Sequence, residues 1–213
     1  MVQTVVHYFD YKSPYAYLAQ AKLFRSCDAG DIHVEWRPYT LDIPSFLGSA
    51  QLDSHGHVTE QSRNAHQWRR VKYAYMDCRR EANRRGLILR GPRKIFDSTC
   101  AHLGFLFAQS RGDFRPYHDA VFELFWRREL DIEDPRVIAT TLNSNGVDGD
   151  SFLNFMEEEG PQLLQDIQRD AESHGVFGVP SYLLDKELFW GAERFHHVLE
   201  LAATQSDGPT SSS

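Results

Sequence analysis

Cysteine is scarce in this sequence: three residues in 213, Cys27, Cys78 and Cys100, share no short spacing. An odd number without a Cys-x-x-Cys pair supports neither a disulfide framework nor a zinc knuckle, and it favours a reducing, cytoplasmic location. No stretch approaches the roughly 18 apolar residues of a membrane span, and no basic and apolar leader precedes the first strand. We therefore expect an unexported, soluble protein that does not insert into membranes.

Excess positive charge is also absent, because the net charge is −7. This argues against duplex nucleic acid and anionic membranes as partners. The hydrophobic content of 41% is enough for one globular domain with a sizeable core. His196-His197 lacks a third ligand at useful spacing, so no metal site is expected.

Two motifs at opposite ends of the chain are the most informative features. The run Val5 to Phe9 alternates like a strand, and a helix follows with Ser13 as its N-cap and Pro14 at its first position. Near the other end, Val179-Pro180 immediately precedes a short apolar strand. A cis proline there can leave a backbone N–H and C=O free to pair with a peptide-like ligand, and we predict a cis bond.

The periodicity of the apolar residues and the positions of Gly, Pro and Asp predict the remaining elements. Residues 32–39 form a second strand, 41–57 a loop rich in Pro, Gly, Ser and Asp, and 181–190 a hairpin with its turn at Asp185-Lys186. Helices are predicted to begin at Pro14 and to cover about 68–82, 97–109, 115–128, 135–145, 149–158, 161–174 and 193–203.

These elements predict an α/β, thioredoxin-like fold with a large all-helical insertion between its βαβ and ββα halves. We expect one domain over residues 1–205, in which about 1–40 and 176–205 form the core and about 58–175 the insertion. Residues 206–213 are too polar to pack and are predicted to be a disordered tail.

The motifs also carry a family resemblance. The segments Tyr8-Phe9-Asp10-Tyr11-Lys12-Ser13-Pro14-Tyr15-Ala16-Tyr17-Leu18-Ala19, Gly175-Val176-Phe177-Gly178-Val179-Pro180-Ser181 and Leu188-Phe189-Trp190-Gly191 resemble 2-hydroxychromene-2-carboxylate isomerases and the related kappa-class glutathione transferases of the DsbA-like superfamily. The resemblance implies glutathione as cofactor, with Ser13 beside its sulfur and the Val179-Pro180 backbone pairing with the tripeptide.

The resemblance further implies an acidic residue after Trp-Gly that holds the γ-glutamyl group. Relatives usually have a small polar residue and then Asp there, whereas this chain has Ala192 and Glu193. The carboxylate is kept with one more methylene, and the hydroxyl or amide donor is lost. Arg70 falls where relatives tend to carry a lysine near glutathione, and its guanidinium could hold a carboxylate. Family members are often dimers, so a homodimer is implied.

The residue types at the helix start point to the same chemistry. Redox members of the superfamily carry Cys-x-x-Cys there, but this chain has Ser13 and Ala16, so it cannot cycle a disulfide at this place. The helix N-terminus still favours an anion by about 0.3–2 kcal/mol, which suits the thiolate of a bound thiol. Tyr11, Pro14 and Tyr15 flank Ser13 and are expected to line a pocket for an aromatic or conjugated substrate.

The sequence thus predicts a glutathione-dependent isomerase in which the thiolate adds reversibly to a conjugated C=C bond. Two alternatives stay open. One is a kappa-type glutathione transferase or peroxidase. The other is a non-catalytic, redox-inactive module that binds a peptide or a partner at the Val179 edge. A serine before proline is, on its own, only a helix cap.

Overall fold

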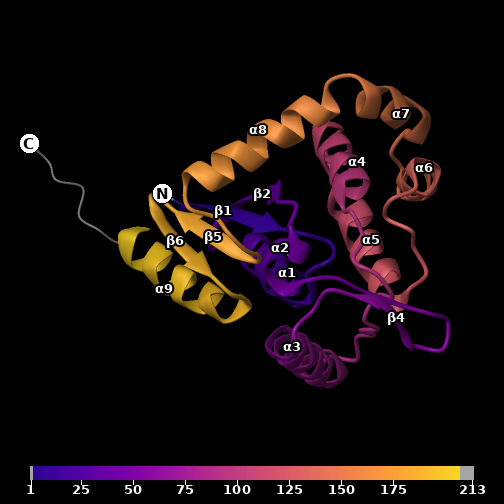
Figure 1. Ribbon diagram of the computed structural model, residues 1–213. Helices are drawn as coiled ribbons and strands as arrows, with labels where there is room; N and C mark the ends of the chain where they lie inside the picture. Colours follow the sequence, from indigo (N-terminus) through magenta and orange to yellow (C-terminus); the bar gives the residue numbers. More distant parts are fainter. Residues whose placement is uncertain (1, 207–213) are drawn as a thin grey trace, which may run out of the picture.

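A four-stranded mixed sheet lies at the centre of the computed structural model, which describes residues 2–206 (Figure 1). The strand order is β2-β1-β5-β6. Strands β1 (Thr4–Phe9) and β2 (His33–Pro38) are parallel, and helix α1 (Pro14–Ala29) provides the crossover that a parallel pair requires. Strands β5 (Ser181–Leu184) and β6 (Glu187–Trp190) form the predicted hairpin, with Asp185 in the left-handed region at φ 54°.

Alternation along β1 divides the interior into two packed layers. Val5 and Phe9 belong to the larger core, together with α1 and the insertion helices. Tyr8 faces the other side, where it packs with Leu183 and with Ala171 of helix α8 (Gly160–Ser173). Figure 1 shows α8 on one side of the sheet and α9 on the other. This arrangement confirms the predicted thioredoxin-like fold.

The insertion is mainly helical, and side-chain caps start three of its helices. Asn64 and Gln67 form a capping box at the first of them, and Asp134 and Asp148 each accept hydrogen bonds from backbone N–H groups at later helix starts. The helices before α8 are α3 (Ala65–Arg84), α4 (Thr99–Ser110), α5 (Arg115–Arg127), α6 (Pro135–Ser144) and α7 (Gly149–Glu157).

The predicted loop over 41–57 is wrong in part. Helix α2 (Ile43–Leu47) follows Asp42, whose side chain accepts from the Ser45 N–H, and a hairpin follows that pairs β3 (Ala50–Leu52) with β4 (Val58–Gln61). Because β4 lies inside the predicted insertion, the insertion is not all-helical. Every residue of β4 is exposed, so the strand lacks the apolar alternation that would have revealed it.

After β6 the chain forms a short 3₁₀ turn, η1 (Ala192–Arg194), and then helix α9 (Phe195–Ser206). The sequence predicts one helix over about 193–203 here. Phe195 packs against Tyr182 of β5, with ring centroids 5.4 Å apart. Helix α9 ends at Ser206, the first residue of the predicted tail. The rest of that tail, residues 207–213, lies outside the described residues.

Candidate active site at the tip of α1

Ser13 joins the two ends of the chain. Its Oγ accepts a hydrogen bond from the Ala16 N–H (3.3 Å), which caps α1, and donates one to the Val179 carbonyl (3.3 Å). The bond between Val179 and Pro180 is cis, as predicted. Ser13 is 5% exposed, so its hydroxyl lies at the edge of the interior.

The turn before Ser13 is fixed by a buried carboxylate. Asp10 is fully buried and accepts from the backbone N–H groups of Lys12 (3.0 Å) and Leu41 (2.8 Å), and its own carbonyl accepts from the Ser13 N–H (3.0 Å). Asp10 therefore ties the start of α1 to the segment that leaves β2.

Two basic side chains face Asp10. The Lys12 Nζ and the His102 Nε2 each lie 3.5 Å from a carboxylate oxygen, and His102 Nδ1 is hydrogen-bonded to Thr40 Oγ1 (2.9 Å). Burial raises the pKa of Asp10, but the ammonium charge of Lys12, the interaction with His102 and the hydrogen bond from the Leu41 N–H together outweigh this effect and lower the pKa to about 2. The carboxylate is therefore ionised beside Ser13.

The opposite wall is the segment that leads into β5. The Pro180 carbonyl accepts from the Gly191 N–H (2.9 Å), and Ser181 Oγ donates to the Gly178 carbonyl (2.7 Å). A Cβ at Gly178 would lie 2.7 Å from Trp190 Nε1, so only glycine lets this segment pass so close to β6. Backbone contacts thus hold Val179 against Ser13.

Two backbone donors at this junction make no hydrogen bond to any described residue: the N–H of Tyr15, in the first turn of α1, and the N–H of Val179. Free N–H groups at a helix N-terminus attract anions, and an unpaired N–H beside a strand can pair with an extended peptide. The donor set therefore fits a peptide thiol with its sulfur near Ser13.

The flanking residues divide between core and surface. Tyr11 is fully buried, and its hydroxyl is hydrogen-bonded to His118 Nδ1 (3.1 Å), so it packs in the core instead of lining an open pocket. Pro14 and Tyr15 are half-buried. The Tyr15 hydroxyl donates to Asp77 of α3 (3.3 Å) and thereby joins the first turn of α1 to the insertion.

The remaining candidates lie on separate elements. Ala192 and the exposed Glu193 belong to η1, which contacts α1. Arg70 is exposed on α3, and within the described residues no hydrogen bond or ion pair joins it to Ser13 or Val179.

Sequence reasoning missed Asp10, Lys12 and His102 as parts of the site. The structure buries His102 completely, beside Asp10. An Asp and a Lys just before a helix cap are an available signal, but their buried partner stands about ninety positions later in the sequence. The described residues hold no group of three or more His, Cys, Asp or Glu suited to a metal ion.

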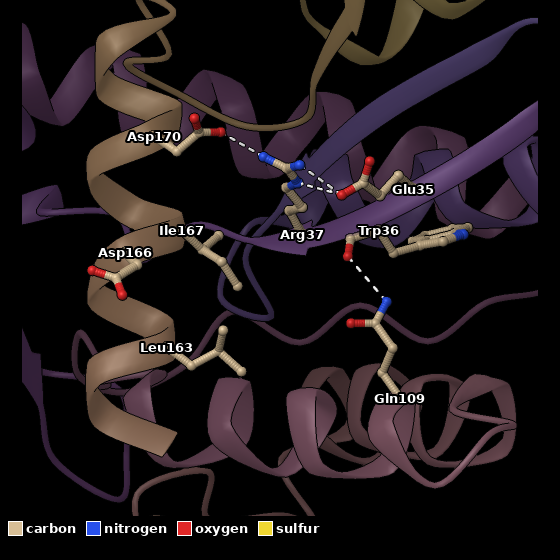
Figure 2. Close-up of a pocket in the computed structure, with 8 residues that line it drawn as sticks. All are labelled: Glu35, Trp36, Arg37, Gln109, Leu163, Asp166, Ile167 and Asp170. Carbon is tan, nitrogen blue, oxygen red and sulfur yellow. Dashed lines mark hydrogen bonds and ion pairs between the residues drawn. The ribbon is translucent and has the colours of Figure 1, made fainter. Parts of the chain in front are cut away.

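A cavity of about 340 Å³ lies between β2, α4 and α8, and its lining includes neither Ser13 nor Val179. Figure 2 shows the Arg37 guanidinium turned toward Glu35 and Asp170, to which it donates at 2.7 and 2.5 Å. Asp166 also lines the cavity. Because two carboxylates already neutralise Arg37, this cavity is poorly suited to an anionic ligand.

No helix within residues 2–206 combines the length and the apolar character needed to cross a lipid bilayer.

The chain is 27% identical over 197 residues to a 2-hydroxychromene-2-carboxylate isomerase of Sphingobium xenophagum, covering 91% of this chain and 95% of the relative. A protein of the same name from Pseudomonas putida is 28% identical over 193 residues, covering 88% of each chain.

The fold is also found among solved structures. A 2-hydroxychromene-2-carboxylate isomerase structure superposes with a TM-score of 0.73 at 20% identity, covering 95% of this chain and 96% of the other. Residues 4–202 match the DSBA-like thioredoxin domain family. Since this match spans nearly the whole sequence, the chain belongs to the DSBA-like thioredoxin domain family.

Proposed function

We propose that this protein is a glutathione-dependent isomerase of aromatic or conjugated carboxylates, of the 2-hydroxychromene-2-carboxylate isomerase type. Two relatives of that name match about nine-tenths of the chain. The observation that carries the proposal is the contact between Ser13 Oγ and the Val179 carbonyl (3.3 Å) at a helix start without cysteine. Such a site can stabilise a thiolate but has no sulfur of its own.

Ser13 acts as a hydrogen-bond donor to the incoming sulfur. Its hydroxyl can turn from the Val179 carbonyl to a thiolate, and a hydrogen bond to a charged group contributes about 1.5–3 kcal/mol. The free Tyr15 N–H and the positive end of α1 add about 0.3–1 kcal/mol. Since one pKa unit corresponds to about 1.4 kcal/mol, these groups together lower a thiol pKa by about one to three units.

Glutathione, when bound, would supply a thiolate whose reversible addition to a conjugated C=C bond lets that bond rotate. The chain orients the tripeptide through the free Val179 N–H and holds its sulfur at Ser13. Glu193 in η1 offers a carboxylate to the γ-glutamyl ammonium, while Ala192 offers no side-chain donor. The lone Glu193 contact favours weaker tripeptide binding than a site with an additional donor.

The test is an ultraviolet assay of cis-trans isomerisation of a 2-hydroxychromene-2-carboxylate-type substrate, with and without glutathione. The variant is Ser13→Ala, and its matched control is Ser26→Ala, the same change at a buried position near the other end of α1. Ser13→Thr keeps the hydroxyl and serves as the rescue variant. Glutathione binding is measured separately by calorimetry, and folding by circular dichroism.

We expect turnover to require glutathione and to fall at least about tenfold in Ser13→Ala, as loss of one charge-assisted hydrogen bond implies. Ser26→Ala should match the parent protein, and Ser13→Thr should recover activity. Turnover without glutathione, or full activity in a folded Ser13→Ala variant that binds glutathione, would refute the proposal. Accumulation of a glutathione conjugate would instead identify a transferase, and absence of glutathione binding a non-catalytic module.

A further inference from the structure

The segment from α3 to α4 is rich in arginine, and two groups of arginines can be distinguished in it and at the adjacent end of α5. The first group pairs with carboxylates: Arg80 with Asp77, and Arg84 and Arg85 with Glu81. The second group has no carboxylate within 4.0 Å among the described residues. Besides Arg69 and Arg70 in the first half of α3, it includes the exposed side chains Arg79, Arg90, Arg93 and Arg128, and we call these four the arginine cluster.

Arg128 is the anchor of the cluster. It is the C-cap of α5 and has a left-handed backbone (φ 63°), and its Nε and Nη2 both donate to the Gly91 carbonyl, the former at 2.8 Å. A Cβ at Gly91 would lie 3.2 Å from the Tyr75 ring, so glycine permits this close packing. The Arg79 guanidinium lies 5.7 Å from the centroid of the same ring. The Tyr75 ring therefore lies between the Arg79 guanidinium and Gly91, the residue whose carbonyl binds Arg128.

The other two members reach only backbone carbonyls. Arg90 donates to the Arg127 carbonyl and Arg93 to the Ser54 carbonyl, each at the long distance of 3.4 Å. These weak contacts leave most of their N–H donors free for another acceptor.

The four charges repel one another. Burial lowers the pKa of Arg128, and Arg93, Arg79 and Arg90 lower it further, so all three lie within electrostatic reach of it. The sequence has 30 acidic residues, yet none of the described ones forms an ion pair with the cluster. An external anion would relieve this repulsion.

A cavity of about 410 Å³ adjoins the cluster, with Arg93 and Arg128 in its wall. Its apolar wall includes Phe96 and Phe125, whose ring centroids are 5.5 Å apart, with Pro92 and Leu130 beside them. Glu129 and Asp131 complete the lining and are acceptors suited to hydroxyl groups. Cations, aromatic rings and acceptors thus meet in one place, which is where the phosphates, base and ribose of a nucleotide would each find a partner.

We propose that the arginine cluster and this cavity form a binding site for a nucleotide or a similar phosphate ester of an aromatic compound. The phosphates contact Arg79, Arg93 and Arg128, and the ring packs against Phe96 and Phe125. None of these residues contacts Ser13 or Val179 in the described structure, so the site is separate from the candidate active site.

Calorimetry with ADP tests the proposal, with adenosine and pyrophosphate as part-ligands. The variant is the double substitution Arg79→Gln and Arg93→Gln, which removes two exposed charges and leaves the Arg128 anchor intact. Arg84→Gln is the matched control, because Arg84 is exposed on the same helix but is paired with Glu81. Ser13→Ala reports whether ADP binding is independent of the candidate active site.

We expect ADP to bind, pyrophosphate to bind more weakly, and adenosine to bind most weakly. The double variant should lose at least about tenfold in ADP affinity, as expected for loss of a charge-assisted hydrogen bond, and affinity should fall with added salt. Arg84→Gln and Ser13→Ala should bind ADP like the parent protein. No ADP binding at millimolar concentration, unchanged affinity in the double variant, or adenosine binding as tight as ADP binding would each overturn the proposal.

Discussion

His7 makes the stability of this protein sensitive to acid. It lies in β1 with no exposed surface, stacked on Tyr182 at 5.1 Å and edge-on to Trp36 at 5.0 Å. Its Nδ1 is hydrogen-bonded to the Ser181 carbonyl (3.3 Å), and its Nε2 has no partner among the described residues. Burial lowers the pKa of His7 to about 3, although the hydrogen bond to Ser181 opposes the shift.

The sign of the effect follows from proton binding. The unfolded chain takes up a proton at this histidine below its ordinary pKa of 6.5, whereas the folded chain stays neutral down to about 3. The stabilisation that the neutral His7 gives the folded state is therefore complete above about pH 6.5 and is lost as the pH falls. At about pH 5 the difference between the pH and 6.5 is about 1.5 units, which corresponds to a loss of about 2 kcal/mol from the free energy of unfolding.

His7→Phe should remove this loss, because phenylalanine keeps the ring contacts and cannot take up a proton. Urea unfolding followed by tryptophan fluorescence at about pH 7 and about pH 5 gives the two free energies, and their difference should shrink by about 2 kcal/mol in the variant. His118 remains and keeps part of the acid sensitivity, since burial holds its pKa well below the ordinary value.

His33→Phe is the control, because His33 is exposed in β2 and its replacement leaves His7 in place. This variant should retain the pH dependence of the parent protein. If the free energy of His7→Phe fell as steeply between the two pH values as that of the parent protein, the reasoning about His7 would be refuted.

Other perturbations have equally direct outcomes. Lys12→Met should lower the free energy of unfolding by about 3–5 kcal/mol in urea titrations, because it leaves the buried Asp10 carboxylate without its ammonium partner; a change under about 1 kcal/mol would contradict this. Gly104→Ala should cost about 1–3 kcal/mol or more, since an added Cβ would lie 2.2 Å from a buried tyrosine hydroxyl, and an unchanged melting temperature would show that the site has room. Cys78 and Cys100 should react with a thiol reagent only after denaturation, because burial raises the pKa of each to about 12; rapid labelling of either in the native protein would disagree.

The sequence was most informative where a local signal coincides with a backbone requirement. Ser13 and Pro14 mark the start of α1, and Val179-Pro180 marks the entry to β5, so both sides of the site could be predicted from a few neighbouring residues. Their contact in space followed from the predicted fold. These are positions where capping geometry and fixed backbone angles leave few alternatives.

Other features depend on tertiary contacts that no local pattern reveals. Tyr11 packs in the core against Phe9 and Phe122, and its buried hydroxyl is hydrogen-bonded to His118, which lies 107 positions away in the sequence. The pairing of Asp10 with His102 likewise joins the first loop of the core to a helix of the insertion, 92 positions later in the sequence. Strand β4 escaped prediction for the opposite reason, because its side chains are all exposed and carry no periodic signal.

The hydrogen bond from Ser13 to Val179 spans 166 positions, so the candidate active site is assembled from the first and last portions of translation. A nascent chain has a capped helix early in synthesis but gains the opposing carbonyl only when nearly all of the polypeptide has left the ribosome. Prematurely terminated products that stop inside α8 would therefore contain Ser13 but lack Val179, the other side of the site. Two separately expressed fragments, divided in the insertion, would have to reassociate before any turnover could be observed.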